Sequence, residues 1–223
     1  MEIIVALDTH EESKLNFLLQ ELKTFKPYYK IGMELFYTNP DMVMKLKDQG
    51  HKVFLDLKLH DIPNTVEKAL TSLKRYNVDL INVHTQGGKV MMEKAANVFH
   101  QTKTLIIGVT QLTSSDESTL RDLGIKLSIN ESVLKLATLA KVSGLHGVVS
   151  SPLEVPIIKE QLGNNFITVT PGIRLDSNTH DQKRVTTPLQ AKELGTDYIV
   201  IGRPITENQS PAQVYQSILK DIV

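Results

Sequence analysis

The chain has 223 residues, 41% of them hydrophobic, which is enough to bury one large core or two small ones. Its 25 basic and 25 acidic residues balance, so no global field favours nucleic acid or an anionic membrane as partner, and an anionic ligand would need local cations. The lack of cysteine excludes disulfides and thiolate metal sites, and the short apolar run at the N-terminus predicts neither a signal peptide nor a membrane span. We therefore expect a cytoplasmic protein.

Short runs of β-branched residues alternate along the chain with amphipathic, charged segments. The predicted strands are, in chain order, Ile3–Leu7, Tyr29–Ile31, Val53–Leu57, Leu80–His84, Leu105–Val109, Gly147–Val149, Ile167–Thr170 and Tyr198–Ile201. The predicted helices are Glu11–Phe25, Pro40–Gln49, Pro63–Tyr76, Gly88–His100, Glu131–Lys141, Leu153–Gln161, Pro188–Leu194 and Pro211–Ile222. This alternation, with no linker, favours an α/β fold with one domain over residues 1–223, a (β/α)8 TIM barrel. An open sheet of six or seven strands stays possible, because the long polar connection Thr110–Asn130 precedes the fifth of the helices.

Charged, polar or turn-forming residues stand at or just after the predicted strand ends, where barrels of this kind place their active sites. They are Asp8, Lys30, Asp56, Lys58, His84, Thr113, Pro171, Gly172, Gly202 and Arg203. The pattern predicts a ring of polar groups at one mouth of the barrel.

Asp56 and Lys58 are two residues apart, so on a strand they point to the same side, with Leu55 and Leu57 on the other. Lys30 on the neighbouring strand adds a second cation, and an alternating Lys-Asp-Lys arrangement can keep all three groups charged. A purely structural ion pair is the alternative, but buried pairs contribute little net stability. The pattern therefore favours a functional site.

Asp61 follows the same strand, and Pro63 stands near the first position of the next helix. Local reasoning leaves two roles open for Asp61: an acid that caps this helix or a site residue.

The turns after the seventh and eighth strands, Pro171–Arg174 and Gly202–Pro204, each combine glycine with arginine. Barrels commonly bind phosphate there, so we predict a phosphate site, with two solvated surface turns as the alternative. The polar segment Asp176–Arg184 is either an ordinary loop or a lid in which Gln182 closes over the phosphate.

His84 is a possible metal ligand or general base, but it has no histidine partner at ligand spacing, and a hydrogen-bonded structural histidine is the favoured interpretation. The other six histidines also lack ligand spacing, so we predict no catalytic metal. No glycine-rich nucleotide motif occurs in the chain.

With the residues placed in this way, the chain resembles the orotidine 5'-phosphate decarboxylase family over essentially its whole length. The resemblance rests on VALD (5–8), YYKIGMELF (28–36), DLKLHDIPNTV (56–66), NVHTQGG (82–88), GVTQLTS (108–114), TPGIR (170–174), DQKR (181–184) and IGRPI (201–205). The DxKxxD core is shared with 3-keto-gulonate 6-phosphate decarboxylases and hexulose-phosphate synthases. DIPNT, PGIR and DQKR resemble the orotidylate branch.

This resemblance implies decarboxylation of orotidine 5'-phosphate to uridine 5'-phosphate (UMP) and carbon dioxide, the last step of de novo UMP synthesis, without a cofactor. It implies a catalytic network of Lys30, Asp56 and Lys58, with Lys58 as proton donor, in a homodimer whose other subunit contributes Asp61 and Thr65. The implied substrate-binding residues are Asp8 for the ribose hydroxyls, Thr113 and Pro171 for the pyrimidine, and Arg174, Gln182, Gly202 and Arg203 for the phosphate and lid.

Two other functions stay open. One is a metal-dependent lyase or epimerase that acts on a pentulose or hexulose phosphate, and sensitivity to EDTA would distinguish it. The other is a non-catalytic barrel that binds a phosphorylated sugar and leaves orotidylate absorbance unchanged.

Overall fold

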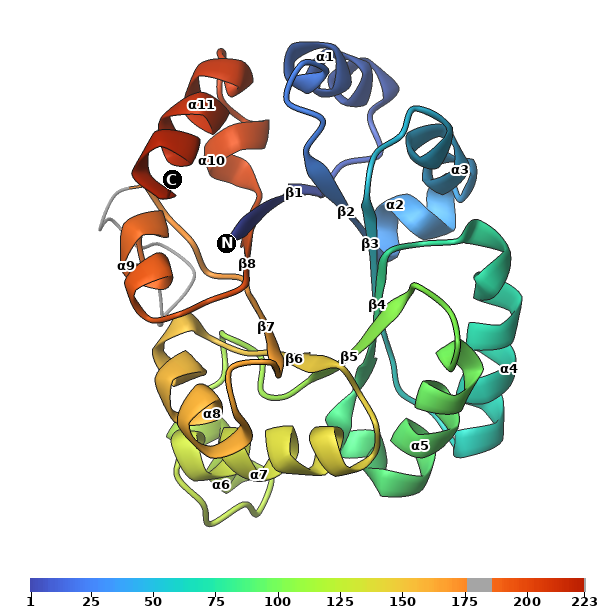
Figure 1. Ribbon diagram of the computed structural model, residues 1–223, viewed down its shortest axis with the longest axis vertical. Helices are drawn as coiled ribbons and strands as arrows, with labels where there is room; N and C mark the ends of the chain where they lie inside the picture. Colours follow the sequence, from blue (N-terminus) through green and yellow to red (C-terminus); the bar gives the residue numbers. More distant parts are fainter. Residues whose placement is uncertain (176–185, 223) are drawn as a thin grey trace.

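The eight strands close into a parallel barrel. In the computed structural model, which describes residues 1–175 and 186–222, each strand pairs with the next in chain order and β8 pairs with β1 (Figure 1). The strands are β1 (Glu2–Leu7), β2 (Tyr28–Gly32), β3 (Val53–Leu59), β4 (Leu80–His84), β5 (Leu105–Val109), β6 (Gly147–Val149), β7 (Ile167–Thr170) and β8 (Tyr198–Ile201). The open-sheet alternative is therefore excluded.

Helices surround the barrel on its outside (Figure 1). The α-helices are α1 (Glu12–Leu22), α2 (Met33–Thr38), α3 (Asp41–Asp48), α4 (Pro63–Leu73), α5 (Gly88–Phe99), α6 (Glu117–Asp122), α7 (Ile129–Val142), α8 (Val155–Leu162), α9 (Pro188–Glu193), α10 (Arg203–Thr206) and α11 (Pro211–Ile222). Three short 3-10 turns, η1 (Lys74–Tyr76), η2 (Thr85–Gly87) and η3 (Pro152–Glu154), adjoin them. No helix in the described part of the chain is long and apolar enough to cross a membrane.

The last five strands have the predicted bounds, whereas β1, β2 and β3 extend one or two residues further. The prediction missed α2, α6 and α10, because helices of 4 to 6 residues are too short to show a 3.6-residue period. The Thr110–Asn130 connection contains one of them, α6, whose N-terminus is capped by the Asp116 carboxylate.

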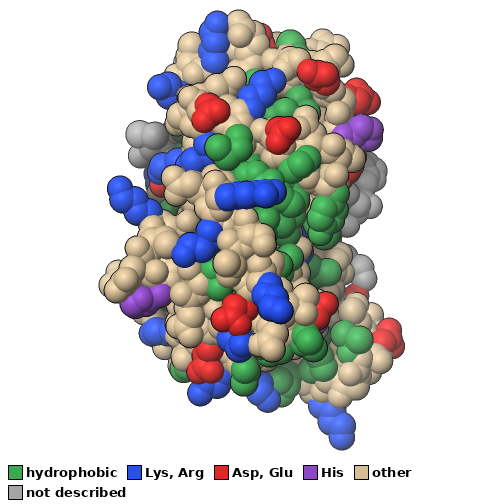
Figure 2. Space-filling view, turned by 90° about the vertical axis from the view of Figure 1, so that its right-hand side faces the viewer, with side chains coloured by type: hydrophobic (Ala, Val, Ile, Leu, Met, Phe, Trp, Pro, Cys, Tyr) green, Lys and Arg blue, Asp and Glu red, His purple; other side chains and the backbone are tan. Residues whose placement is uncertain are grey.

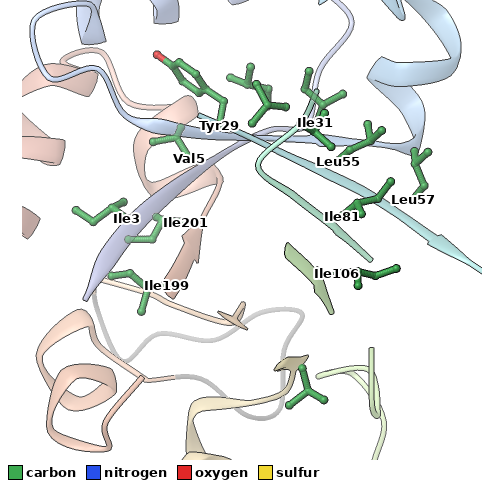
Figure 3. Packing of buried hydrophobic residues seen from close by; sticks show 14 of the residues in the cluster. Ile3, Val5, Tyr29, Ile31, Leu55, Leu57, Ile81, Ile106, Ile199 and Ile201 are labelled. Carbon is green, nitrogen blue, oxygen red and sulfur yellow. The ribbon is translucent and has the colours of Figure 1, made fainter. Parts of the chain in front are cut away.

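Alternation along the strands separates two hydrophobic layers. One set, which includes Ile3, Val5 and Leu55, packs between the strands and the helices (Figure 3). The other set fills the barrel interior, with members such as Ile4 and Phe54. Residues two positions further along the inward rows therefore reach the mouth at the strand carboxyl ends.

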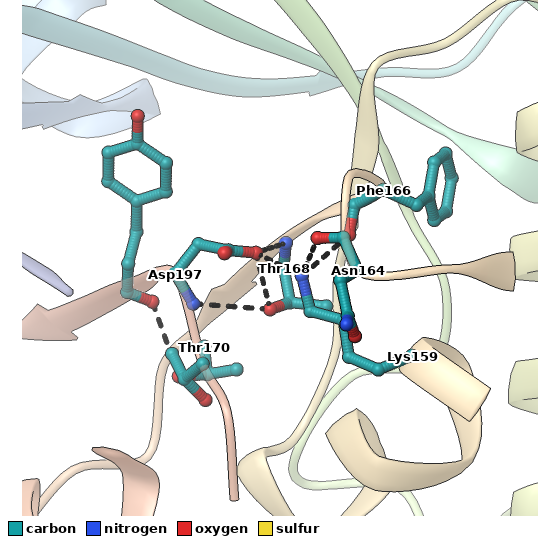
Figure 4. A network of polar contacts seen from close by, with 8 residues as sticks. Lys159, Asn164, Phe166, Thr168, Thr170 and Asp197 are labelled. Atoms are coloured by element: carbon teal, nitrogen blue, oxygen red, sulfur yellow. Dashed lines mark hydrogen bonds and ion pairs between the residues drawn. The ribbon is translucent and has the colours of Figure 1, made fainter.

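The opposite end of the barrel is held by a polar network that joins β7, α8 and the start of β8 (Figure 4). The Asp197 carboxylate accepts hydrogen bonds from Lys159 Nζ at 2.6 Å and from the Thr168 backbone N–H at 2.7 Å. The same Lys159 ammonium donates to two backbone carbonyls. Because these groups satisfy one another at the strand amino ends, they stabilise the barrel on the side away from the mouth.

Candidate active site

A cavity of about 390 Å³ opens at the carboxyl ends of the strands. Its apolar floor is the last inward layer of the barrel, formed by Ala6, Phe54, Val109, Val149, Val169 and Val200. Two acidic and four basic side chains also line it: Asp8, Asp56, Lys30, Lys58, Arg174 and Arg203. The cavity therefore combines an apolar platform with an excess of positive charge.

Lys30, Asp56 and Lys58 form one ion-paired chain across β2 and β3. Lys58 Nζ lies 2.7 Å from Asp56 Oδ1, and Lys30 Nζ lies 3.5 Å from Asp56 Oδ2. Lys30 also donates to Asp8 Oδ1 at 2.8 Å. Leu55 and Leu57 lie in the layer under the helices, as the alternation predicted. The sequence thus predicted the juxtaposition of the three charged residues correctly.

The network keeps its buried members charged. Burial raises the pKa of Asp56, but Lys30, Lys58 and the Asn82 amide together outweigh that effect and hold the pKa below its ordinary value. Burial lowers the pKa of Lys30, yet the carboxylates of Asp56 and Asp8 raise it above its ordinary value on balance. Asp56 is therefore an anion and Lys30 a cation at neutral pH.

A bulge in β3 sets the direction of Lys58. The register of β3 against β4 shifts between Leu55 and Leu59, and Lys58 has a φ of 49°, a left-handed conformation that is costly for a residue with a side chain. As in other bulges beside active sites, the irregularity re-aims a side chain, here into the cavity next to Asp56.

A glycine leaves room for the contact between Lys30 and Asp8. A Cβ on Gly32 would lie 3.3 Å from Lys30 Nζ, which is tight, whereas a Cβ on Gly202 would meet Asp8 Oδ2 at an ordinary contact distance of 3.6 Å. Because the Asp8 side chain is 60% exposed while it holds the buried Lys30, one end of the ion-paired chain reaches open space in the cavity. This is a suitable position for binding a hydroxyl group.

The loops after β5, β7 and β8 bring the remaining predicted residues to the same cavity. Thr113 lines it from the β5 loop, and Pro171, Gly172 and Arg174 line it from the β7 loop. Gly202 and Arg203 complete the β8 side at the start of α10. The two Gly-and-Arg turns thus lie around one space, as expected for a shared anion site.

Asp61 and Thr65 are predicted site residues that do not line this cavity. They lie with Tyr37, His60 and Lys58 around a separate hollow of about 280 Å³ beyond the end of β3. Pro63 is the first residue of α4 as predicted, but Ile62 is the N-cap and makes no side-chain cap bond. Among the described residues, Asp61 Oδ1 accepts a hydrogen bond only from the adjacent Ile62 N–H, at 2.6 Å. Asp61 therefore does not cap the helix.

Gln182 and the rest of the predicted lid, Asp176–Arg184, lie outside the described residues. His84 lies outside the main cavity's lining, accepts a hydrogen bond from the Gln86 N–H at 3.4 Å and stacks on the ring of His60. This is the geometry of a hydrogen-bonded structural histidine. Within residues 1–175 and 186–222, no group of three His, Asp or Glu side chains is placed to hold a metal ion.

Sequence reasoning missed Asn82, a fully buried residue in the middle of β4. Its amide donates to Asp56 Oδ1 at 2.6 Å and accepts from the Lys58 N–H at 2.7 Å. The signal was present, because Asn82 lies two residues after the inward-facing Leu80, just as Asp56 lies two after Phe54. The cavity lining also includes Gln111 and Ser114, two residues of the polar stretch after β5 that were not predicted as site residues.

Comparison with known proteins gives a consistent result over the whole chain. The model of the Orotidine 5'-phosphate decarboxylase / HUMPS family matches residues 1–218. The orotidine 5'-phosphate decarboxylase of Staphylococcus saprophyticus is 50% identical over 221 residues, covering 96% of this chain and 95% of that protein. The protein of the same name from Staphylococcus aureus (strain COL) is 49% identical over 220 residues, with 96% and 95% coverage.

Solved structures agree. The crystal structure of orotidine 5'-phosphate decarboxylase from Lactobacillus acidophilus has a TM-score of 0.88 at 40% identity and covers 99% of this chain and 98% of that one. An uncharacterized conserved protein from Geobacillus kaustophilus has a TM-score of 0.87 at 42% identity, covering 99% and 100%. With the match extending over nearly every residue, the chain belongs to the Orotidine 5'-phosphate decarboxylase / HUMPS family.

Proposed function

We propose that this protein converts orotidine 5'-phosphate to UMP and carbon dioxide without a cofactor, as the last step of de novo UMP synthesis, with residues 1–223 acting as one catalytic domain. The observation that carries the proposal is the buried Lys30–Asp56–Lys58 chain in a cavity that Arg174 and Arg203 also line. Family membership and the identity to named decarboxylases support the choice of substrate.

The chemistry explains why such a charged chain is useful. Breaking the bond between the ring carbon and the carboxylate leaves the electron pair on a carbon that cannot delocalise it in the ordinary way. Fixed cations that are already oriented stabilise such charge without reorganising during the reaction. Lys58 fills this role and then transfers a proton from Nζ to the ring carbon, so that carbon dioxide leaves and a C–H bond replaces the broken bond.

Asp56 has two tasks in this proposal. It accepts from Lys58 Nζ at 2.7 Å, which orients the ammonium group, and its own charge faces the space of the substrate carboxylate. Because Asp56 stays ionised, placing a second carboxylate nearby is unfavourable until carbon dioxide leaves. Lys30 balances the charge of Asp56 and joins it to Asp8, which binds the ribose hydroxyls.

The arginine side of the cavity binds the phosphate. Arg174 and Arg203 are the cations there, and Gly202 offers backbone without a side chain. Thr113 and Pro171 contact the pyrimidine between the two charged ends of the cavity. The phosphate is remote from the reacting bond, but its binding energy helps to hold Lys30, Asp56 and Lys58 in their reactive arrangement.

We further propose a homodimer in which Asp61 and Thr65 complete the partner's site. They lie beside Lys58 but outside the main cavity, and the neighbouring Ile62 and Tyr37 expose about two thirds of their surface. Figure 2 shows the side of the barrel that carries α3 and α4, where hydrophobic side chains gather in the middle of the face. A second copy that covers exposed apolar groups near α4 would bring Asp61 toward the other Lys58.

The test is a spectrophotometric assay of purified protein with orotidine 5'-phosphate in EDTA. Loss of orotidylate absorbance with formation of UMP is the expected result. Activity that disappears in EDTA and returns with a divalent metal would favour the metal-dependent alternative. Binding with no absorbance change would indicate a non-catalytic barrel.

A further inference from the structure

Asn82 contacts the ion-paired residues Asp56 and Lys58 from outside the cavity lining. Its side chain is fully buried on β4, and it is not among the described residues that line the cavity. Residues of this kind cannot touch the substrate, so any effect on the reaction must pass through neighbours. Its neighbours here are the two residues that carry the proposed chemistry, Asp56 and Lys58.

Both ends of the Asn82 amide are used. Nδ2 donates to Asp56 Oδ1 at 2.6 Å, and Oδ1 accepts from the Lys58 backbone N–H at 2.7 Å. The orientation is fixed, because an ionised carboxylate can only accept and a backbone N–H can only donate. The same Asp56 Oδ1 also accepts from Lys58 Nζ, so one amide joins the carboxylate to the main chain of the residue that pairs with it.

The strand register explains why a side chain is needed here. Between the pairs Leu55↔Ile81 and Leu59↔Val83, β3 advances four residues while β4 advances two. The Lys58 N–H, displaced by this bulge, is bound by the Asn82 side chain instead of a ladder carbonyl. The bond also supports the left-handed backbone of Lys58 at φ 49°.

We propose that Asn82 is a positioning residue for decarboxylation, which holds the Asp56 carboxylate and the Lys58 bulge in their reactive arrangement. This inference rests on the proposed function and extends it to a residue outside the cavity lining. Loss of the amide would free the carboxylate to rotate and let the bulge relax, and small errors of position at reacting groups reduce the rate strongly.

Removal of the Asn82 amide should also change the pH dependence of kcat. The titratable groups that face Asp56 are Lys30 from β2 and Lys58 from β3, Asp8 joins through Lys30, and β4 contributes the non-titrating Asn82. Burial lowers the pKa of the half-buried His84 at the end of β4, and the nearby His60 and Lys58 lower that pKa further. Because the Asn82 bond is one of the interactions that lower the pKa of Asp56, its removal should move the acidic limb of kcat to higher pH.

Two variants separate positioning from support of the fold. Asn82→Ala removes both hydrogen bonds together with the side-chain volume, whereas Asn82→Leu removes both bonds and keeps a side chain of similar volume. We expect kcat to fall about tenfold or more in both, with KM and the dissociation constant for UMP within about threefold of wild type. The acidic limb should move upward in Asn82→Ala.

The matched control is Thr104→Val, which removes a buried side-chain bond to the Val78 carbonyl, 2.7 Å long, at the opposite end of the barrel. It should lower the melting temperature and leave kcat and the pH profile unchanged. If Asn82→Ala does not fold, Asn82→Leu carries the test.

Wild-type kcat in a folded Asn82→Leu protein would overturn the inference, because the reaction would then need neither hydrogen bond of the amide. An unmoved acidic limb in a folded Asn82→Ala protein would overturn it as well. If wild type and the Asn82 variants all decarboxylate orotidine 5'-phosphate at the same rate, only this inference is refuted. If wild type is inactive, the proposed function is refuted together with it.

Discussion

Replacing Asp56 by asparagine isolates the charge at the centre of the site, because the side chain keeps its shape and one acceptor oxygen. Lys30, whose side chain is 11% exposed, would lose its partner at 3.5 Å and keep only Asp8 at 2.8 Å. Leaving a buried charge without its partner costs about 3–5 kcal/mol. Since Lys30 retains Asp8 and the less buried Lys58 can turn toward water, the lower end, about 3 kcal/mol, is the expected loss in unfolding free energy.

For a chain of this size, each kcal/mol shifts the melting temperature by about 2–4 °C, so Asp56→Asn should melt about 6–12 °C below wild type at pH 7. Differential scanning calorimetry at one fixed protein concentration measures this difference, since the melting temperature of a protein in the proposed dimeric state would depend on concentration. Glu93→Gln, which breaks the exposed pair with Lys89, is the control and should shift melting by about 1 °C or less.

The difference in melting temperature between wild type and Asp56→Asn should depend on pH. The folded pKa of Asp56 lies below its unfolded value of about 3.9, so its charge stabilises the fold above that pH and the stabilisation is lost as pH falls through the folded pKa. The gap between wild type and Asp56→Asn should therefore be constant above about pH 5 and narrow below about pH 4. A gap under about 2 °C at pH 7, or one that widens in acid, would refute the reasoning.

Other predictions concern the reaction. Lys58→Ala should lose nearly all decarboxylation while its far-ultraviolet circular dichroism stays native, and substantial residual turnover would remove Lys58 as proton donor. Arg203→Ala should lower kcat/KM by more than about tenfold against about twofold or less for the exposed Arg121→Ala, and a loss below about threefold, under 1 kcal/mol, would contradict phosphate binding. Inactive Lys58→Ala and Asp61→Ala proteins, mixed in equal amounts and allowed to exchange subunits, should regain about a quarter of wild-type activity, because half the dimers carry one intact site. No recovery in a mixture shown to exchange subunits would contradict shared sites.

The barrel could be predicted because its signals are local. Runs such as Leu105–Val109 have sharp ends and the bounds of their strands, and the order of strands and helices limits the possible topologies. The charged pair Asp56 and Lys58 was also predictable, since a two-residue spacing on a strand fixes a common side.

Other features depend on contacts between strands that no local pattern carries. The bulge at Lys58 arises from the register against β4, and its stabilisation by Asn82 joins residues 24 positions apart. Short helices such as α10 form where a turn is held by its surroundings, and propensity over four residues is too weak to indicate them. The role of Asp61 is not decided by one chain, because its side chain lies outside the cavity of that chain.

The central claim is that fixed charges on the protein release carbon dioxide from orotidylate without help from a metal or cofactor. It is tested most directly with protein dialysed against EDTA and orotidine 5'-phosphate labelled with ¹³C in the carboxyl group. The prediction is labelled carbon dioxide in equal amount to UMP with wild type, and none above background with Lys58→Ala. Labelled carbon dioxide that appears only after a metal or cofactor is added, or equally with Lys58→Ala, would contradict the claim.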